Sequence, residues 1–139
     1  MTIQDIQKEI VDEFSFFEDW QQKYEYLIEL GKSLTPLSKV ERTADRLIKG
    51  CQSQVWLKAD MDGDNIVFDA DSDAILPKGI AALLIRLYSG QRPEDIITSN
   101  ENFLHEIGLQ EFLSPTRANG TLAMIKQIKL YAIGLKMKK

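Results

Sequence analysis

The chain of 139 residues contains one cysteine, Cys51, and one histidine, His105. A single thiol cannot form a disulfide within the chain, and exchange of the Cys-x-x-Cys type needs a second, resolving cysteine. Structural zinc and iron–sulfur clusters are held by several Cys or His side chains, more than one copy of this chain supplies. These shortages exclude an internal redox relay and a metal scaffold within one copy, and we expect no resident metal or cofactor.

Long apolar runs and basic clusters are also scarce. No stretch approaches the ~20 apolar residues that a membrane-spanning helix needs, and the N-terminus lacks the basic and apolar regions of a secretory signal. The net charge is -4 and the only long cationic cluster is residues 136–139, so no basic face for nucleic-acid phosphates is evident. A lone cysteine is typical of reducing compartments. We therefore expect a cytoplasmic protein that binds neither nucleic acid nor membrane.

The composition that remains is that of an ordinary folded domain. Apolar residues make up 44% of the chain and charged residues 27%, both near the averages for globular proteins. No Gly/Ser-rich or Pro-rich linker and no internal repeat divides the sequence. We predict a single domain spanning residues 1–139, which at this length buries enough surface to fold alone.

The apolar spacing predicts two helices at the N-terminus. The first has apolar residues at three- and four-residue steps, and Thr2 with Asp5 forms a plausible capping pair. Its apolar positions are Ile3, Ile6, Ile10, Phe14 and Phe17. Asp19 can cap the second helix, and Gly31 stands where a left-handed helix stop is expected. Residues 41–48 suit either a short helix or an ordered loop.

A change of period follows the cysteine. Apolar residues alternate with others over residues 55–71, and residues 62–65 read as a tight turn, so a β-hairpin is predicted. A short third strand near residues 72–76 would end at Pro77 and Gly79.

The second half of the chain predicts further helices. Residues 79–90 are nearly all apolar, which favours a central helix surrounded by other elements. Pro93 begins a short helix, two more short pieces lie within residues 102–112, and a long helix ends the chain. The apolar stripe expected on that last helix is Leu122, Ile125, Ile128, Ala132 and Leu135. The predicted fold class is α+β, with a small antiparallel three-stranded sheet flanked by helices.

Cys51 stands between Gly50 and the polar residues Gln52 and Ser53. A free cysteine is most often a buried and inert residue. Glycine and polar neighbours are instead typical of an ordered loop that enters a strand. The local sequence therefore favours a thiol with a chemical role.

The chemistry open to this thiol depends on its neighbours. Arg46 and Lys49 precede it, and nearby positive charge lowers the pKa of a thiol. The surroundings of His105 indicate an exposed helical face, so a Cys51–His105 hydrolytic dyad is not expected. Persulfide carriage remains, and there a lone cysteine is an advantage. A second thiol would attack Cys–S–SH, form a disulfide and release sulfide.

Two other segments carry notable charge. The acidic residues of positions 60–73 do not follow the spacing of an EF-hand loop. We interpret them as a hairpin turn and a solvated strand face, which could steer a basic partner. Residues 113–120 predict a structured turn before the last helix. Arg117 in that turn is either a solvated charge or a guanidinium that stabilises an anion beside a thiolate or persulfide.

With these segments together, the chain resembles the SufE family of sulfur-acceptor proteins over about residues 20–132. The strongest similarity is Gly50-Cys51-Gln52-Ser53-Gln54-Val55-Trp56, which looks like the family's signature around its acceptor cysteine. Further similar segments, in the same order, are Lys78-Gly79, Tyr88 with Pro93 to Ile96, Gly108-Leu109, and Leu113 to Arg117 with Gly120 and Met124. The resemblance implies a compact α+β fold related to the NifU-like iron–sulfur scaffold proteins, without their metal-ligand cysteines.

The resemblance also implies a function. Such proteins are accessory sulfur-transfer proteins rather than enzymes. They accept sulfur as a persulfide from a pyridoxal-phosphate-dependent cysteine desulfurase of the SufS-like or CsdA-like type, stimulate it, and pass the sulfur to a SufBCD-like cluster assembly complex. On this chain, Cys51 would be the acceptor nucleophile. The implied persulfide environment is Gly50, Gln52, Ser53 and Arg117.

The partner desulfurase, the final acceptor of the sulfur and the oligomeric state stay open at this level. Arg46 stands where relatives often have asparagine, which would alter the packing of the cysteine loop. A monomer and a homodimer are both compatible with the sequence. The competing hypothesis is a non-catalytic interaction module in which Cys51 is incidental and the acidic hairpin or the last helix makes the contacts.

Overall fold

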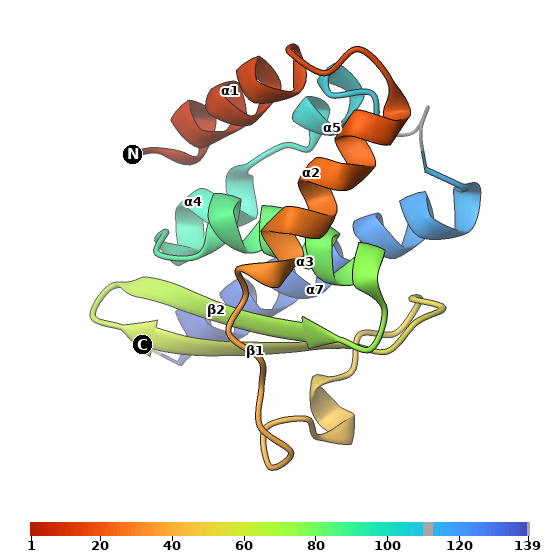
Figure 1. Cartoon of the computed structure of the whole chain (residues 1–139). Helices are drawn as coiled ribbons and strands as arrows, with labels where there is room; N and C mark the ends of the chain where they lie inside the picture. The colour runs from red at the N-terminus through yellow and green to blue at the C-terminus, as the bar shows by residue number, and fades with distance from the viewer. Residues whose placement is uncertain (110–112, 139) are drawn as a thin grey trace.

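A computed structural model describes residues 1–109 and 113–138 and forms an α+β arrangement (Figure 1). The elements in chain order are α1 (Ile3–Phe14), α2 (Trp20–Lys32), a 3-10 turn (Ala44–Arg46), β1 (Val55–Asp62), β2 (Asn65–Ser72), α3 (Ile75–Tyr88), α4 (Pro93–Thr98), α5 (Asn102–Glu106) and α7 (Pro115–Met137). The second short helical piece predicted within residues 102–112 falls partly on residues 110–112, outside the described residues.

Side-chain caps determine where the first two helices begin. The Thr2 hydroxyl accepts the backbone N–H of Asp5, and the Asp5 carboxylate accepts the backbone N–H of Thr2, both at 3.1 Å. The Asp19 carboxylate accepts the N–H of Gln22 at 2.9 Å. Each bond satisfies a donor that a helix start leaves without a partner. Both predicted helix starts are confirmed.

Gly31 has a different role from the predicted helix stop. It lies inside α2 and does not have a positive φ. A Cβ built on Gly31 would lie 2.9 Å from the Gly79 nitrogen, and a Cβ on Gly79 would lie 2.1 Å from the Leu27 carbonyl oxygen. The two glycines therefore allow the backbones of α2 and α3 to approach more closely than any side chain would permit.

The sheet contains two strands among the described residues. β1 and β2 pair antiparallel from Val55 opposite Ser72 to Asp62 opposite Asn65. Gly63, in the connecting turn, has φ +63°, as such tight hairpins require. The predicted third strand at residues 72–76 is wrong. α3 begins at Ile75 and includes Pro77 in its first turn, where the missing N–H has no helical acceptor to lose.

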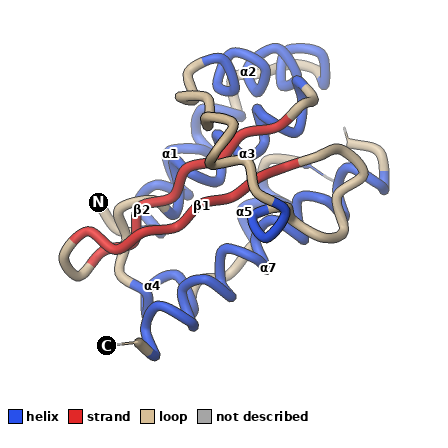
Figure 2. Tube along the Cα trace, turned by 90° about the horizontal axis from the view of Figure 1, so that it is seen from below, coloured by secondary structure: helices blue, strands red, loops and turns tan. Residues whose placement is uncertain are grey.

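α3 lies between the hairpin and the N-terminal helices, as Figure 1 shows. Seen from below, the hairpin crosses the molecule and α7 runs along its β1 side (Figure 2). The Tyr131 hydroxyl of α7 donates to the Leu57 carbonyl of β1 at 3.3 Å. The fully buried side chains of α3 include Ile80, Leu83, Leu84 and Leu87. The predicted central helix is thus confirmed, although it starts four residues earlier than expected, at Ile75.

Asp71 contradicts the prediction of a solvated acidic strand face. Its side chain is 1% exposed. Its carboxylate accepts the backbone N–H groups of Leu37 and Ser72 and a hydrogen bond from Arg42, and Lys78 lies 3.5 Å away. Burial raises the pKa of Asp71, but these hydrogen bonds and the Lys78 charge outweigh it and leave the pKa below the ordinary value of 3.8. One carboxylate therefore joins residues 37–42, the end of β2 and α3.

The last helix also differs from its prediction. The Ser114 hydroxyl accepts the N–H of Arg117 at 3.3 Å, and Pro115 occupies the first helical position. The turn predicted for residues 113–120 is therefore mostly the first turns of α7. Of the predicted stripe, Ile125, Ile128 and Ala132 are buried and Leu135 is half-buried, whereas Leu122 is exposed on another face.

Candidate functional site

The cysteine lies at the tip of a loop whose two ends are held by hydrogen bonds. At one end, the N–H of Ile48 donates to the Val55 carbonyl at 2.9 Å. At the other end, the N–H of Gln54 donates to the Asp73 carboxylate at 3.1 Å, and the Gln54 carbonyl accepts the Ser72 hydroxyl at 2.7 Å. Residues 49–53 therefore project from an anchored base.

Gly50 provides the backbone conformation that this loop needs. Its φ is +93°, a region that L side chains rarely adopt. A Cβ at this position would also lie 3.2 Å from the Cβ of Ala123 on α7. Glycine thus turns the chain toward the cysteine and lets the loop lie against α7.

The Cys51 thiol is directed toward α7. It is half-buried, and its Sγ lies 3.5 Å from the Gly120 carbonyl oxygen, to which the S–H can donate. Burial raises the pKa of the Cys51 thiol above its ordinary value of 9.0. The sequence left open whether Arg46 and Lys49 lie close enough to lower this pKa, and in this arrangement burial raises it. The Arg46 guanidinium instead donates to the Glu41 carbonyl at 2.8 Å.

A cavity of about 80 Å³ opens beside the thiol. Its walls come from three parts of the chain that are distant in sequence: the cysteine loop, the start of α3 and the start of α7. The lining residues are Cys51, Gln52, Ser53, Pro77, Ile80, Thr116, Arg117, Gly120 and Met124. Pro77, Ile80, Thr116, Gly120 and Met124 were not predicted as site residues from the sequence. His105 is exposed on α5 and is not among these residues.

The first turn of α7 contributes a favourable electrostatic environment for an anion. Thr116 and Arg117 lie at the N-terminal end of a helix of 23 residues, where the helix dipole is positive. Arg117, an exposed residue of this turn, also lines the cavity and carries a positive charge. The sequence signal that could have indicated this end was the Ser114-Pro115 pair, which is a typical helix start rather than a turn. The cavity thus combines a nucleophilic atom with groups that favour negative charge.

The sequence model for the SufE family, described as an Fe-S metabolism associated domain, matches residues 8–132. The chain belongs to the SufE family. It is 39% identical over 131 residues to an uncharacterised SufE-like protein of Rhizobium meliloti, covering 91% of this chain and 94% of the relative. It is 42% identical over 132 residues to SufE-like protein 1, chloroplastic/mitochondrial, of Arabidopsis thaliana, covering 94% of this chain but 36% of that longer protein.

A solved structure supports the fold. The solution structure of a hypothetical protein from Thermus thermophilus superimposes with a TM-score of 0.78 and covers 93% of this chain and 94% of that one. At 21% identity, this likeness bears on the fold alone. The expected α+β class is confirmed, with two strands in place of three in the described residues.

Family membership supports a coarse statement of function. A SufE domain indicates a role in iron–sulfur metabolism and sulfur transfer, as an accessory protein that interacts with a cysteine desulfurase. Within the part of the chain that the structure describes, no helix has both the length and the apolar character needed to cross a membrane. The expected cytoplasmic location stays a prediction.

Proposed function

We propose that this chain carries sulfur as a persulfide on Cys51. It takes the sulfur from a pyridoxal-phosphate-dependent cysteine desulfurase, stimulates that enzyme and passes the sulfur to an iron–sulfur cluster assembly complex. The observation that carries the proposal is the position of the thiol, at the tip of an anchored loop and half-buried in a cavity.

The transfer step needs no oxidant. The Cys51 thiolate attacks the outer sulfur of the desulfurase persulfide, and a new S–S bond forms on Cys51. The S–S bond of the desulfurase breaks, and its cysteine leaves as a thiolate that is ready for another turnover. Because this chain has no second cysteine, the Cys51 persulfide meets no internal thiol that could release it as sulfide.

The observed position of the loop suits storage better than attack. Burial and the Gly120 carbonyl both favour the neutral thiol over the thiolate. Moving residues 49–53 out of the cavity would return the Cys51 pKa toward its ordinary value and raise the fraction of thiolate. We therefore propose that the loop extends into the desulfurase to accept sulfur and then returns to the cavity, where solvent thiols reach it less easily.

Arg117 has a specific role in this proposal. An anionic persulfide in the cavity would lie near the Arg117 guanidinium and the positive end of α7. Both would stabilise the charge that burial disfavours. Gln52 and Ser53 line the same cavity and complete its polar wall.

The decisive experiment is sulfur loading. The chain is mixed with a cysteine desulfurase and L-cysteine, and intact mass spectrometry is used to look for the gain of one sulfur that a thiol reductant removes. We expect the gain on the native chain and on an Arg92→Met control, which changes an exposed residue that does not line the cavity. A Cys51→Ser chain that gained sulfur equally would contradict the proposal and favour the interaction module.

Loop movement and the Arg117 role have separate tests. Hydrogen exchange around Gln52 should differ between the free chain and its complex with the desulfurase, and equal exchange in the two would contradict the movement. An Arg117→Met chain should lose its persulfide to reductant faster than the native chain. An Arg92→Met chain, changed at an exposed arginine outside the cavity, should behave as native.

A further inference from the structure

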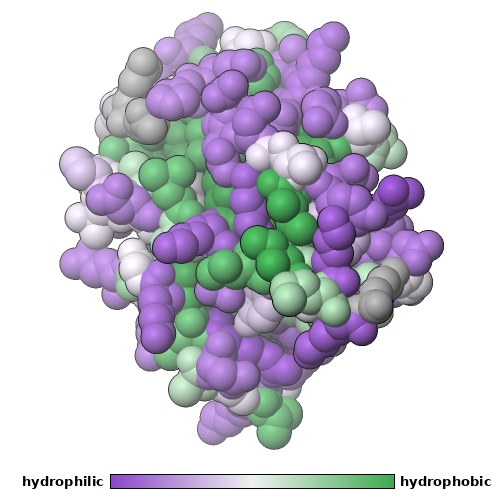
Figure 3. Space-filling model, turned by 180° about the vertical axis from the view of Figure 1, so that it is seen from behind, coloured by the Kyte–Doolittle hydropathy of each residue, from purple (hydrophilic) through white to green (hydrophobic). Residues whose placement is uncertain are grey.

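The exposed side of α7 is unusual for a surface helix. Ile125, Ile128 and Ala132 already face the core, yet the opposite side also carries large apolar residues. Their exposed fractions are 46% for Leu122, 49% for Leu130, 42% for Ile133 and 81% for Met137. A helix that is apolar on two faces is normally covered on both. Figure 3 views the molecule from the side on which α7 lies and shows apolar side chains gathered among hydrophilic ones.

The spacing of these residues indicates what shape would cover them. We call Leu122, Lys126, Leu130, Ile133 and Met137 the outer face of α7. They follow one another at steps of three and four residues and form one narrow row along the helix. Such a row is the surface to which another helix packs, with its own apolar residues at the same spacing.

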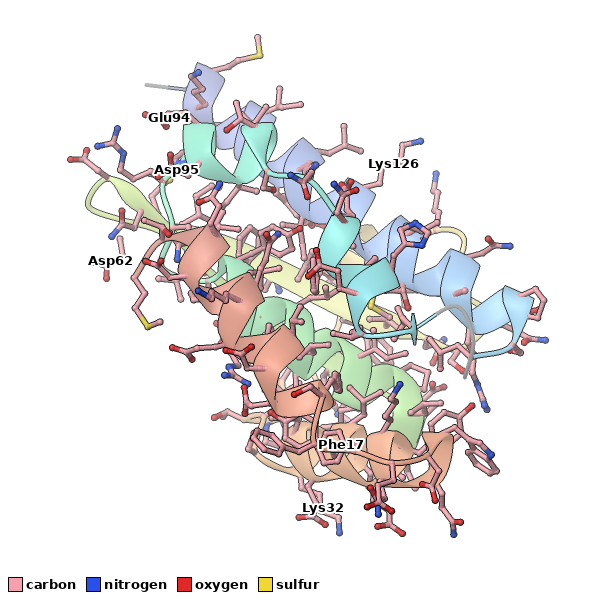
Figure 4. All side chains as sticks on the ribbon, turned by 90° about the horizontal axis from the view of Figure 1, so that it is seen from above. Phe17, Lys32, Asp62, Glu94, Asp95 and Lys126 are labelled. Carbon is pink, nitrogen blue, oxygen red and sulfur yellow. The ribbon has the colours of Figure 1, made fainter. Side chains whose placement is uncertain are left out.

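Charge indicates the chemistry of that helix. All 21 acidic residues of the chain precede residue 115, whereas six of the 17 Lys and Arg residues follow it. Lys129 pairs with Glu101 at 2.7 Å, but no ion pair among the described residues includes Lys126 or Lys136. In Figure 4, Lys126 projects away from the body on one side of α7, and Glu94 and Asp95 of α4 lie on the other. Lys136 lines a surface hollow together with Asp64 and Glu94, so the positive charge that the outer face itself offers beside its apolar contacts is that of Lys126.

We propose that the outer face of α7 is a docking surface for an acidic amphipathic helix of a partner protein. Apolar residues of that helix cover Leu130 and Ile133, and a carboxylate of that helix pairs with Lys126. The surface does not include Cys51. Binding there can therefore be measured on a chain that carries no sulfur.

Two other occupants fit less well. A second copy placed face to face would put Lys126 of both copies into one interface, and the outer face has no acidic residue to pair with either of them. A lipid surface suits a helix with a broad apolar face that includes aromatic residues and keeps its lysines on the polar side. The outer face has Lys126 inside its row and no aromatic residue.

The test uses the whole chain as the target for selecting binders from a library of displayed helical peptides. The apolar row of the peptides is constant, and the positions beside it are randomised among Glu, Lys and Ser. We expect Glu to be enriched and the selected peptides to bind more weakly as salt is raised. Lys126→Glu or Leu130→Glu should weaken binding about tenfold or more. Phe16→Glu, at an exposed apolar residue of another surface, should leave binding unchanged.

The remaining outcomes also decide the matter. Enrichment of Lys at the flanking positions of the peptides would overturn the proposal. It would also be overturned if the native chain selected no more peptides than a control chain that carries both Lys126→Glu and Leu130→Glu. Two other results would also overturn it, if no peptide is selected. One is binding of the chain to phosphatidylserine-containing vesicles, and the other is a dimer in sedimentation velocity, where Leu130→Glu abolishes the binding or the dimer. A Cys51→Ser chain should bind the peptides as the native chain does. Failure of this proposal and failure of sulfur transfer are therefore read separately.

Discussion

The close approach of α2 and α3 can be tested with one chemical change made at different glycines. A Cβ on Gly79 would lie 2.1 Å from the Leu27 carbonyl oxygen and 2.6 Å from its carbon. These are backbone atoms, so Gly79→Ala can be accommodated only if α2 and α3 move apart. In α7, by contrast, a Cβ on Gly134 would meet nothing within 4 Å. Gly134→Ala is therefore a matched control in an exposed part of a helix.

The expected magnitudes follow from these contacts. Separating two packed helices around the fully buried Leu27 should cost about 3 to 5 kcal/mol. The better helix propensity of alanine returns about 1 kcal/mol. Gly79→Ala should therefore lower the free energy of unfolding by about 2 to 4 kcal/mol, whereas Gly134→Ala should raise it by about 1 kcal/mol. Gly31→Ala should fall between them, since its Cβ would lie 2.9 Å from the Gly79 nitrogen.

Equilibrium unfolding in urea, followed by circular dichroism, measures all three variants against the native chain. If Gly79→Ala and Gly134→Ala differ by less than about 0.5 kcal/mol, the helices are not in the contact described and the reasoning is refuted. The same packing bears on the candidate site, because α3 contributes Pro77 and Ile80 to the cavity wall. Gly79→Ala should therefore also make Cys51 easier to alkylate.

Three further predictions concern charge and the cysteine loop. Because the pKa of Asp71 is lowered in the folded chain, its carboxylate stabilises the fold at pH values above the ordinary pKa of 3.8. This stabilisation is lost as the pH falls through the lowered pKa. Asp71→Asn should thus lower the free energy of unfolding by about 2 to 3 kcal/mol near neutral pH. This is less than the loss of a fully buried ion pair would cost, because Arg42 is partly exposed. Urea unfolding should show this difference shrinking in acid; a constant difference would contradict the assignment. Burial raises the pKa of Cys51, so its alkylation should have a midpoint above 9.0 in the folded chain and a lower one in urea; equal midpoints would argue against the docked thiol. A Cβ on Gly120 would lie 3.6 Å from Sγ, so Gly120→Ala should be tolerated, while Gly120→Val should displace the loop and speed alkylation. A Gly120→Val chain with native alkylation rates would show that the loop does not rest on α7.

Local sequence patterns were sufficient for most of the secondary structure. The caps at Thr2 and Asp19, the turn at Gly63 and the apolar run of α3 depend on residues a few positions apart, and all were predicted. The strand predicted at residues 72–76 failed because Pro77 was treated as a terminator. A proline in the first turn of a helix is compatible with the helix that starts there.

The sequence by itself determined that the chain has one thiol, in a polar loop after a glycine, and that no internal thiol competes with it. Only the tertiary structure decided the surroundings of that thiol. Arg117, 66 positions away from Cys51, reaches the cavity because α7 passes beneath the loop, whereas the nearby Arg46 is directed to Glu41. The direction of the Cys51 pKa shift followed from burial against α7 and not from neighbouring cations in the sequence. Caps and turns are local interactions, but burial and charge pairing depend on which distant segments the fold brings together.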